Sequence, residues 1–345
     1  MKLSYSRLPL TLRDTFRISR EASDTRENVL VKVVDETGTE GIGESAPSRF
    51  YDQTAATVIE DIAGVELDQF AEPFGLELIL ASLSNRFGIR RSGLAAIDMA
   101  LHDLVAKRLG IPLVQWFGLD RYACPPTSFT IGLASLDEIR RKTEAASDYK
   151  VLKVKLGGEQ DREIVAAIRE FSSVPLRVDA NAAWSLHEAL EQVKWLRDEG
   201  VELVEQPLAP KDYDGMRRLT EASPLPIIAD ESSETAEDVV RLRGCVHGIN
   251  IKLNKCGGLR EALKMVHIAR AQGMQVMLGC FIESSVGISA AASLSPLVDY
   301  VDLDGHLLIR DDPFEGLTLD DGRVIPSARP GLGLAMNNPG LGLAH

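Results

Sequence analysis

The chain has 345 residues, of which 45% are hydrophobic and 26% charged, the balance of a folded globular protein with one large or two ordinary domains. Its 38 Lys and Arg against 51 Asp and Glu give a formal net charge of −13 at pH 7. This acidic charge argues against nucleic acid and against an anionic membrane surface as main partners, because both attract basic proteins.

The cysteines and the apolar segments point to a cytoplasmic protein. The four cysteines lie far apart and form no CxxC or Cys/His cluster, so we expect neither a disulfide framework nor a zinc ribbon. The N-terminus lacks the apolar segment of a signal peptide, and no run approaches 18 apolar residues. We therefore expect neither secretion nor a membrane span.

The first part of the chain predicts an α+β domain in which strands precede helices. Apolar residues alternate on both faces of a strand-like run at 29–34, a turn follows at 36–38, and a second strand begins near Gly41. This pattern predicts an antiparallel meander.

A helix is predicted over residues 92–110. Its apolar residues recur at steps of three and four and form one stripe, Ser92 is placed to act as the N-cap, and Gly110 ends the pattern. With the meander, this helix completes the predicted first domain, residues 1–124.

From about residue 125 the pattern changes to eight short strand-like segments separated by amphipathic stretches. This alternation is typical of parallel βαβ units, and eight of them over roughly 180 residues predict a (β/α) barrel spanning 125–310. An open doubly wound sheet is the alternative, but its dinucleotide-binding versions carry a GxGxxG motif that this chain lacks. The predicted strand segments are residues 128–132, 151–157, 176–181, 203–207, 226–232, 248–254, 276–284 and 298–305.

The last residues, 311–345, contain the hexapeptide PGLGLA twice, at 330–335 and 339–344. Two copies are too few for a repeat architecture. We expect a C-terminal segment that packs back on the first domain and has an irregular end.

Two lysines stand out inside the second predicted barrel strand. Lys153 and Lys155 are two residues apart, so both point to the same face of the strand. In a barrel, helices cover the outer face, and the lysines would then point into the lumen. The alternative is an edge strand with a solvated lysine face.

Carboxylates end the next three predicted strands. Asp179, Glu205 and Asp230 are spaced 26 and 25 residues apart, about one βα unit each, so they should converge at the carboxyl end of the barrel, where active sites of this fold lie. Oxygen ligands without nitrogen or sulfur suit a hard cation such as Mg²⁺. A single acid at such a position is more often a helix N-cap, but three in register are not explained in that way.

A lysine follows on the next strand, Lys252, 22 residues after Asp230. In a closed eight-stranded barrel it lies four strands from Lys155, on the opposite side of the lumen. Two amines so placed can remove a proton from one face of a carbon and return it on the other, while a metal stabilises an enediolate. A lysine base requires a lowered pKa, for which Lys153 and the metal would serve. The alternative for Lys252 is a solvated strand end.

The eighth predicted strand carries Asp302 and Asp304, again on one face. Two further lumen acids require a positive partner, for which a substrate ammonium group is the natural candidate. A solvated turn before Gly305 is the alternative.

Five motifs occur in order at barrel spacing and together resemble the enolase superfamily, within it the muconate lactonizing enzyme subgroup. They are Lys-Val-Lys (153–155), Val-Asp-Ala-Asn (178–181), Val-Glu-Gln-Pro (204–207), Ala-Asp-Glu-Ser (229–232) and Asn-Ile-Lys-Leu-Asn-Lys-Cys-Gly-Gly (250–258).

The resemblance implies an α/β fold, a (β/α)₇β TIM-like barrel under an α+β capping domain, with Mg²⁺ bound by the three acids and with Lys155 and Lys252 as acid/base residues. Asp-Leu-Asp-Gly (302–305) and Cys-Phe-Ile-Glu-Ser (280–284) resemble dipeptide epimerases of the L-Ala-D/L-Glu epimerase type, in which two acids hold the substrate's ammonium. His306 stands where that family often has proline. The implied isomerase transfers a proton at the α-carbon of the C-terminal residue of a dipeptide.

Four other functions are alternatives to this one. o-Succinylbenzoate synthase and N-acylamino acid racemase share the lysine pair, but their substrates have no ammonium for Asp302 and Asp304. Acid-sugar dehydratases of the superfamily typically use a histidine on the seventh strand, and this chain has none there. A barrel that binds a metal and an acidic ligand without catalysis would need neither lysine.

Side-chain specificity would come from capping-domain loops, expected at 15–28 and 48–53. In the first, the arginines could bind an acidic substrate side chain bidentately or simply be solvated; in the second, the aromatic residues could line an apolar pocket. The sequence leaves the preferred dipeptide open, and likewise whether the protein forms a homo-oligomer. The candidate specificity residues are Arg17, Arg20, Arg26, Phe50 and Tyr51.

Overall fold

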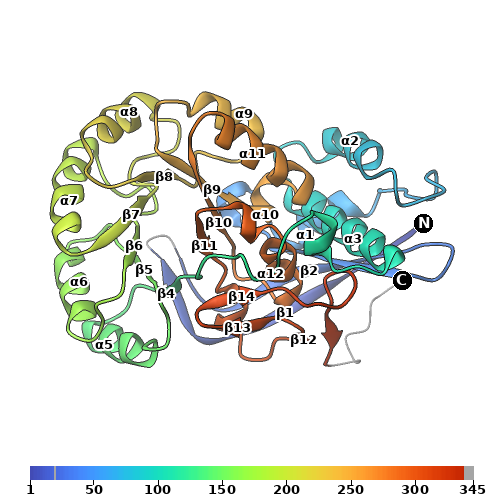
Figure 1. Ribbon diagram of the computed structural model, residues 1–345, viewed down its shortest axis with the longest axis horizontal. Coiled ribbons are helices and arrows are strands. Elements are labelled where there is room, and N and C mark those ends of the chain that lie inside the picture. Colours follow the sequence, from blue (N-terminus) through green and yellow to red (C-terminus); the bar gives the residue numbers. More distant parts are fainter. Residues whose placement is uncertain (19–20, 338–345) are drawn as a thin grey trace.

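The computed structural model describes residues 1–18 and 21–337. Within them, a three-stranded antiparallel sheet stands beside an eight-stranded parallel sheet, and two small ribbons lie near the C-terminal end (Figure 1). The helices α5 to α8 follow one another around the outside of the parallel sheet.

The N-terminal sheet is the predicted meander, in the order β1-β2-β3. Both faces of its central strand are buried: Val29, Val31 and Val33 pack in the capping-domain core, and Leu30 belongs to the barrel core. This is why the run is apolar at successive positions. The predicted loop at 15–28 is wrong, because most of it continues two paired strands. The strands are β1 (Lys2–Ile18), β2 (Glu21–Val34) and β3 (Glu40–Ser45).

The predicted helix at 92–110 is α3, and it ends as expected at Gly110, whose φ of 72° is left-handed. Two details were wrong. Arg91, not Ser92, is the N-cap, and the helix is buried all round from Ser92 to Ala106 rather than along one stripe. It is enclosed by β2 and β3 and by neighbouring helices of both domains. The capping helices are η1 (Arg49–Tyr51), α1 (Ala55–Ile62), α2 (Leu76–Phe87), α3 (Ser92–Leu109) and α4 (Leu113–Trp116).

All eight predicted barrel strands are present, and they pair in parallel in sequence order. A bridge between Thr127 and Val301, with a 3.0 Å hydrogen bond from the Ser128 N–H to the Val301 carbonyl, nearly closes the ring. The open doubly wound sheet is therefore excluded. The strands are β4 (Phe129–Ile131), β5 (Leu152–Lys155), β6 (Leu176–Asp179), β7 (Val201–Glu205), β8 (Ile227–Ala229), β9 (Gly248–Lys252), β10 (Gln275–Gly279) and β11 (Tyr300–Asp302).

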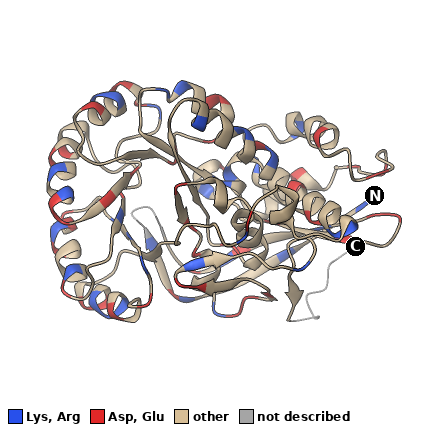
Figure 2. Ribbon diagram, viewed as in Figure 1, with Lys and Arg blue, Asp and Glu red and all other residues tan. Residues whose placement is uncertain are grey.

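Helices cover the outside of the ring, and Figure 2 shows many charged residues of both signs along them. Ser135 and Ser185 begin α5 and α7 with capping boxes, in which each serine pairs with a glutamate three residues later. The barrel helices are α5 (Leu136–Ala145), α6 (Asp161–Arg169), α7 (Leu186–Asp198), α8 (Tyr213–Ala222), α9 (Ala236–Arg241), α10 (Leu253–Cys256), α11 (Leu259–Ala271), α12 (Ser285–Ala292), η2 (Ser295–Leu297) and η3 (Gly305–Leu308).

The C-terminal segment returns to the capping domain. The first PGLGLA copy has little regular secondary structure but is anchored: Gly331 bridges to Pro112, and the Leu332 N–H donates a 2.7 Å hydrogen bond to Asp103 of α3. The second copy lies outside the described residues, and the domain boundaries stay a prediction. The strands here are β12 (Phe314–Glu315), β13 (Thr318–Asp320), β14 (Arg323–Ile325) and β15 (Ala335–Met336).

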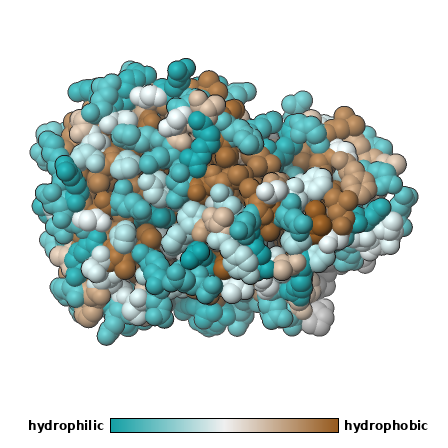
Figure 3. Space-filling model, in the orientation of Figure 1, coloured by the Kyte–Doolittle hydropathy of each residue, from teal (hydrophilic) through white to brown (hydrophobic). Residues whose placement is uncertain are grey.

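The surface in Figure 3 is largely hydrophilic, with hydrophobic residues gathered in the middle of the view and over the capping part. Among the described residues, no helix is both long and apolar enough to cross a membrane. All four cysteines are free thiols.

Candidate active site

The predicted lumen lysines are buried. The side chains of Lys153 and Lys155 are 2% and 10% exposed, which excludes the solvated edge strand. Strand alternation places both lysines on the inner face of β5. Leu152 and Val154, which alternate with them, point to the other face and pack in the barrel core.

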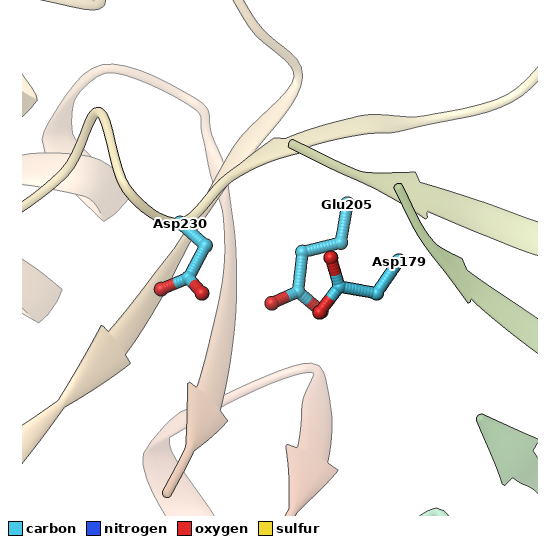
Figure 4. Close-up of side chains that lie close together, drawn as sticks. All are labelled: Asp179, Glu205 and Asp230. Atoms are coloured by element: carbon cyan, nitrogen blue, oxygen red, sulfur yellow. The ribbon is translucent and has the colours of Figure 1, made fainter. Parts of the chain in front are cut away.

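The three strand-end carboxylates come together as predicted (Figure 4). Asp179 and Glu205 are direct neighbours in the register of β6 and β7, and Asp230 follows the last residue of β8. One ligand oxygen from each lies within 4.8 Å of the others, and all three residues are buried. Neighbouring parallel strands therefore turn an even sequence spacing into a cluster.

Lysines contact each of these carboxylates. Lys155 Nζ lies 2.6 Å from Asp179 Oδ2, and Lys153 Nζ lies 2.7 Å from Glu205 Oε2. Burial raises the pKa of Asp179, but the ammonium groups of the two lysines outweigh it and hold that pKa below its ordinary value. Burial and the neighbouring Asp179 carboxylate raise the pKa of Glu205 to about 7.

This donor set fits Mg²⁺. Three oxygen ligands converge from three strands, with no nitrogen or sulfur ligand among them. Keeping Glu205 ionised against burial and against Asp179 requires added positive charge, which a divalent cation provides. The residues present are thus suited to a magnesium ion.

On the far side of the lumen, Lys252 Nζ lies 2.8 Å from Asp230 Oδ2 and 5.0 Å from the centre of the Phe281 ring. The lysine is buried, so the solvated strand end is excluded. Burial lowers its pKa, but Asp230 outweighs burial and raises the pKa above its ordinary value. The expected lowering of the lysine pKa includes the charge of a bound cation beside Asp230, so it stays a prediction.

Asp302 and Asp304 both reach the same cavity as the lysines, but they differ in their contacts. Asp302 accepts a 2.8 Å hydrogen bond from the Lys153 ammonium and a 2.6 Å hydrogen bond from the Ser128 hydroxyl. The expectation that both acids lack a positive partner within the protein was wrong for Asp302. Asp304 accepts a 2.7 Å hydrogen bond from the Thr130 N–H, and burial together with Asp302 raises its pKa to about 6.

The cavity has a volume of about 820 Å³ and is walled by both domains. From the capping domain, Arg26, Phe50 and Tyr51 reach it, and the Tyr51 and Phe281 rings meet edge to face at 6.3 Å. Arg17 is exposed and does not line it, and Arg20 lies outside the described residues.

Two buried residues of the site had no predicted role. Lys255 donates to Asp230 Oδ1 and to the carbonyls of Asp230 and Asn250, at 2.6, 2.6 and 2.9 Å. The Asn250 amide donates 2.9 Å to Glu205 Oε1. Strand alternation could have placed Asn250 beside Lys252 in the lumen, whereas Lys255 lies in α10, past the strand, where no such rule applies.

Two family models match the chain. One, described as "Mandelate racemase / muconate lactonizing enzyme, N-terminal domain", matches residues 5–118, and the other, "Enolase C-terminal domain-like", matches residues 135–340.

Individual relatives match almost end to end. The chain is 41% identical over 336 residues to the L-Ala-D/L-Glu epimerase of Bacteroides thetaiotaomicron, covering 97% of this chain and 88% of that one. It is 37% identical over 345 residues to the hydrophobic dipeptide epimerase of Roseobacter litoralis, covering 96% and 98%. A solved dipeptide epimerase from Enterococcus faecalis, complexed with Mg and the dipeptide L-Leu-L-Tyr, matches with a TM-score of 0.90 at 31% identity, covering 96% and 98%.

Proposed function

We propose that this chain, which belongs to the mandelate racemase/muconate lactonizing enzyme family, is a magnesium-dependent dipeptide epimerase, an isomerase that inverts the α-carbon of the C-terminal residue of a dipeptide. The observation that carries the proposal is the placement of two buried lysines, Lys155 and Lys252. They stand on strands four apart in the ring, on either side of the carboxylate cluster.

In this proposal Asp179, Glu205 and Asp230 hold the metal ion. When bound, Mg²⁺ supplies positive charge beside the substrate carboxylate, which offsets the negative charge that this group gains as the α-proton leaves. Lys153 has a separate role: its ammonium lies between Glu205 and Asp302, pairs with both and offsets the repulsion between the two carboxylates.

Lys155 and Lys252 then share the proton transfer. For one epimer, one lysine in its neutral amine form removes the α-proton and becomes an ammonium, while the other lysine, as an ammonium, donates a proton to the opposite face. For the other epimer the roles and the starting protonation states are exchanged. The buried setting keeps bulk water from competing for these protons.

Asp302 and Asp304 are proposed to hold the substrate's free ammonium. Asp304 is the better placed, because its side chain has no lysine contact among the described residues while Asp302 is paired with Lys153. This pairing of acids favours a dipeptide over the substrates of o-succinylbenzoate synthase or N-acylamino acid racemase, which carry no ammonium group.

The cavity offers two kinds of side-chain recognition. Arg26 could bind an acidic side chain, as the name of the Bacteroides relative suggests. Phe50, Tyr51 and Phe281 favour an apolar one, as in the Roseobacter relative. Three aromatic rings and two edge-to-face contacts make the apolar wall the more extensive feature.

A library of L,L-dipeptides incubated with the enzyme and Mg²⁺ in D₂O tests the proposal. We expect deuterium to enter only at the α-carbon of the second residue, fastest for apolar or acidic residues there. Free amino acids and N-acetylated dipeptides are the controls. No uptake with any dipeptide would contradict the proposed function.

A further inference from the structure

A second buried cluster joins the two domains outside the metal site. Its centre is Glu44, at the end of β3 in the capping domain, whose side chain is fully buried. Its carboxylate oxygens accept hydrogen bonds from the Asn28 amide at 2.7 Å and from the Ser284 and Gly287 N–H groups at 3.0 and 3.1 Å. The Ser284 hydroxyl adds a fourth at 2.5 Å.

Three of these donors belong to the barrel, and they define one segment. Ser284 and Gly287 lie at the start of α12, directly after residues 280–283, which follow β10. Asn28 strengthens the same link, because its amide also donates 3.0 Å to the Ile282 carbonyl. A charged acceptor shared by four donors holds a segment more firmly than neutral hydrogen bonds would.

The segment held in this way forms one wall of the active-site cavity. Cys280, Phe281 and Ile282 line the cavity, and the Phe281 ring covers the Lys252 ammonium at 5.0 Å. The cation–π contact fixes where that ammonium stands relative to the substrate.

Directly after β3, the capping domain makes a second contact with the chain near Lys252. The Ala46 N–H donates 2.9 Å to Asn254 Oδ1, two residues after Lys252 on α10. The short run Glu44–Ala46 therefore hydrogen-bonds both to Ser284 and Gly287 after β10 and to Asn254, two residues after Lys252. Among the described residues, Lys155 on β5 makes no hydrogen bond or ion pair with this run.

We propose that Glu44 is a positioning residue: from the capping domain it fixes the 280–284 segment and, through Phe281, sets the position of the Lys252 ammonium. The kinetic consequence of this positioning rests on the proposed function, because the effect is expected for the epimer whose α-proton Lys252 removes. Glu44 does not line the cavity, so its loss should act on one of the two lysines selectively and not on substrate binding.

The Glu44→Gln variant tests this directly. A glutamine places an NH₂ group against the Gly287 N–H, so two donors meet and the link is weakened. Amide hydrogen exchange should show the Ser284 and Gly287 amides opening roughly tenfold or more faster than in the wild type. This measurement does not depend on the proposed function. Unchanged exchange rates of these two amides would overturn the inference, whatever the enzymatic activity of the variant.

The kinetic arm measures α-proton exchange from each epimer at initial rate. Lys252→Ala first identifies the epimer that depends on Lys252. Glu44→Gln should slow exchange from that same epimer by roughly tenfold or more, with exchange from the other epimer within about threefold of wild type. Equal loss from both epimers would overturn the inference, while a Lys252→Ala variant without selective loss would count against the proposed function instead.

Two further variants serve as controls. Ser284→Ala removes one donor to Glu44 and should give the same selective pattern at smaller size if Glu44→Gln fails to fold. Asp103→Asn alters another fully buried capping-domain carboxylate, which accepts N–H groups of Ile42 and Leu332 but contacts no cavity residue. It should lower stability without changing the ratio of the two exchange rates.

Discussion

At the scale of single residues, the chemistry rests on charged side chains inside a barrel that cannot solvate them. Four lysines and four carboxylates in the lumen contact one another directly, and the lysines are Lys153, Lys155, Lys252 and Lys255. Removing one member leaves a buried, unpaired partner, which is strongly unfavourable. Substitutions that keep shape but change charge are therefore the informative ones.

The two lysines are predicted to be stereochemically distinct. Lys252→Ala should lower α-proton exchange from one epimer by about 10²–10⁴-fold while the other epimer still exchanges, and Lys155→Ala should do the reverse. Their positions on β9 and β5, on either side of the carboxylate cluster, are the reason. Proton exchange followed by NMR decides it, and equal losses from both epimers in both variants would indicate a single base acting through water.

Asp304→Asn is predicted to separate ammonium binding from metal binding. A half-paired buried ammonium costs about 2–5 kcal/mol, or roughly 30- to 5,000-fold in kcat/KM. Magnesium affinity should hardly change, because Asp304 is no ligand of the cluster. Asp302→Asn is the less clean variant, since it also removes a contact of Lys153.

N-acetylated dipeptides should be poor substrates for the same reason as the Asp304→Asn variant. If kcat/KM were the same for free and acetylated dipeptides, the ammonium role of the two acids would be wrong, and N-acylamino acid racemization would be the better account.

At the scale of elements, strand alternation and spacing predicted which residues meet. Residues two apart on one strand, such as Lys153 and Lys155, share the lumen because the side-chain period of a strand is two. Equal steps between Asp179, Glu205 and Asp230 predicted a cluster because the strands are parallel and in register.

The same patterns could not predict features that depend on what packs against an element. Nothing local to α3 shows that it is enclosed on all sides, so its sequence was taken for a one-sided helix. Nor does the sequence show that Lys153 reaches Asp302, which lies 149 residues away and six strands further along the ring. The paired strands within 15–28 resemble a loop because most of the polar residues described at 15–17 and 22–27 are exposed.

The segment between β10 and α12 also predicts a pH effect on stability. Burial and the charge of Glu44 raise the pKa of Glu283 to about 8. Because the folded-state pKa lies above the unfolded value, the protonated group stabilises the fold fully below about pH 4.5, and this contribution is lost as pH rises through about 8.

Glu283→Gln replaces the carboxyl with a neutral amide that resembles its protonated form. The variant should therefore not lose this stability as the pH rises. Its stability relative to wild type should rise from pH 5 to pH 9, by up to about 5 kcal/mol. Denaturant unfolding at several pH values measures the difference, and a difference that stays constant over this range would show that Glu283 is already ionised in the folded protein.

At the scale of the whole molecule, the active site exists only where two domains meet. The barrel supplies the acids and lysines, and the capping domain supplies much of the cavity wall and the carboxylate of Glu44. The sequence predicted both halves and the acids and strand lysines of the barrel half, but not Asn250 or Lys255. It could not predict the contacts between the two halves, because those depend on residues far apart in the chain, such as the hydrogen bond between Gly287 and Glu44, which lie 243 positions apart.

Removing the metal should affect the whole molecule. Chelation is expected to abolish activity and to lower the melting temperature, because three buried carboxylates lose their shared cation. Asp179→Asn, Glu205→Gln and Asp230→Asn should each weaken Mg²⁺ binding in calorimetry, since a neutral amide offsets less of its charge. Full activity in excess chelator would show that the cluster is not the metal site.

The most direct test of the central claim follows configuration and isotope together. A single L,L-dipeptide that is turned over in D₂O with Mg²⁺ should yield its epimer, inverted only at the C-terminal residue, with one deuterium at that α-carbon and no change in composition otherwise. Deuterium at the N-terminal residue, loss of water from the substrate, or inversion without deuterium would each contradict a two-lysine proton transfer at that carbon.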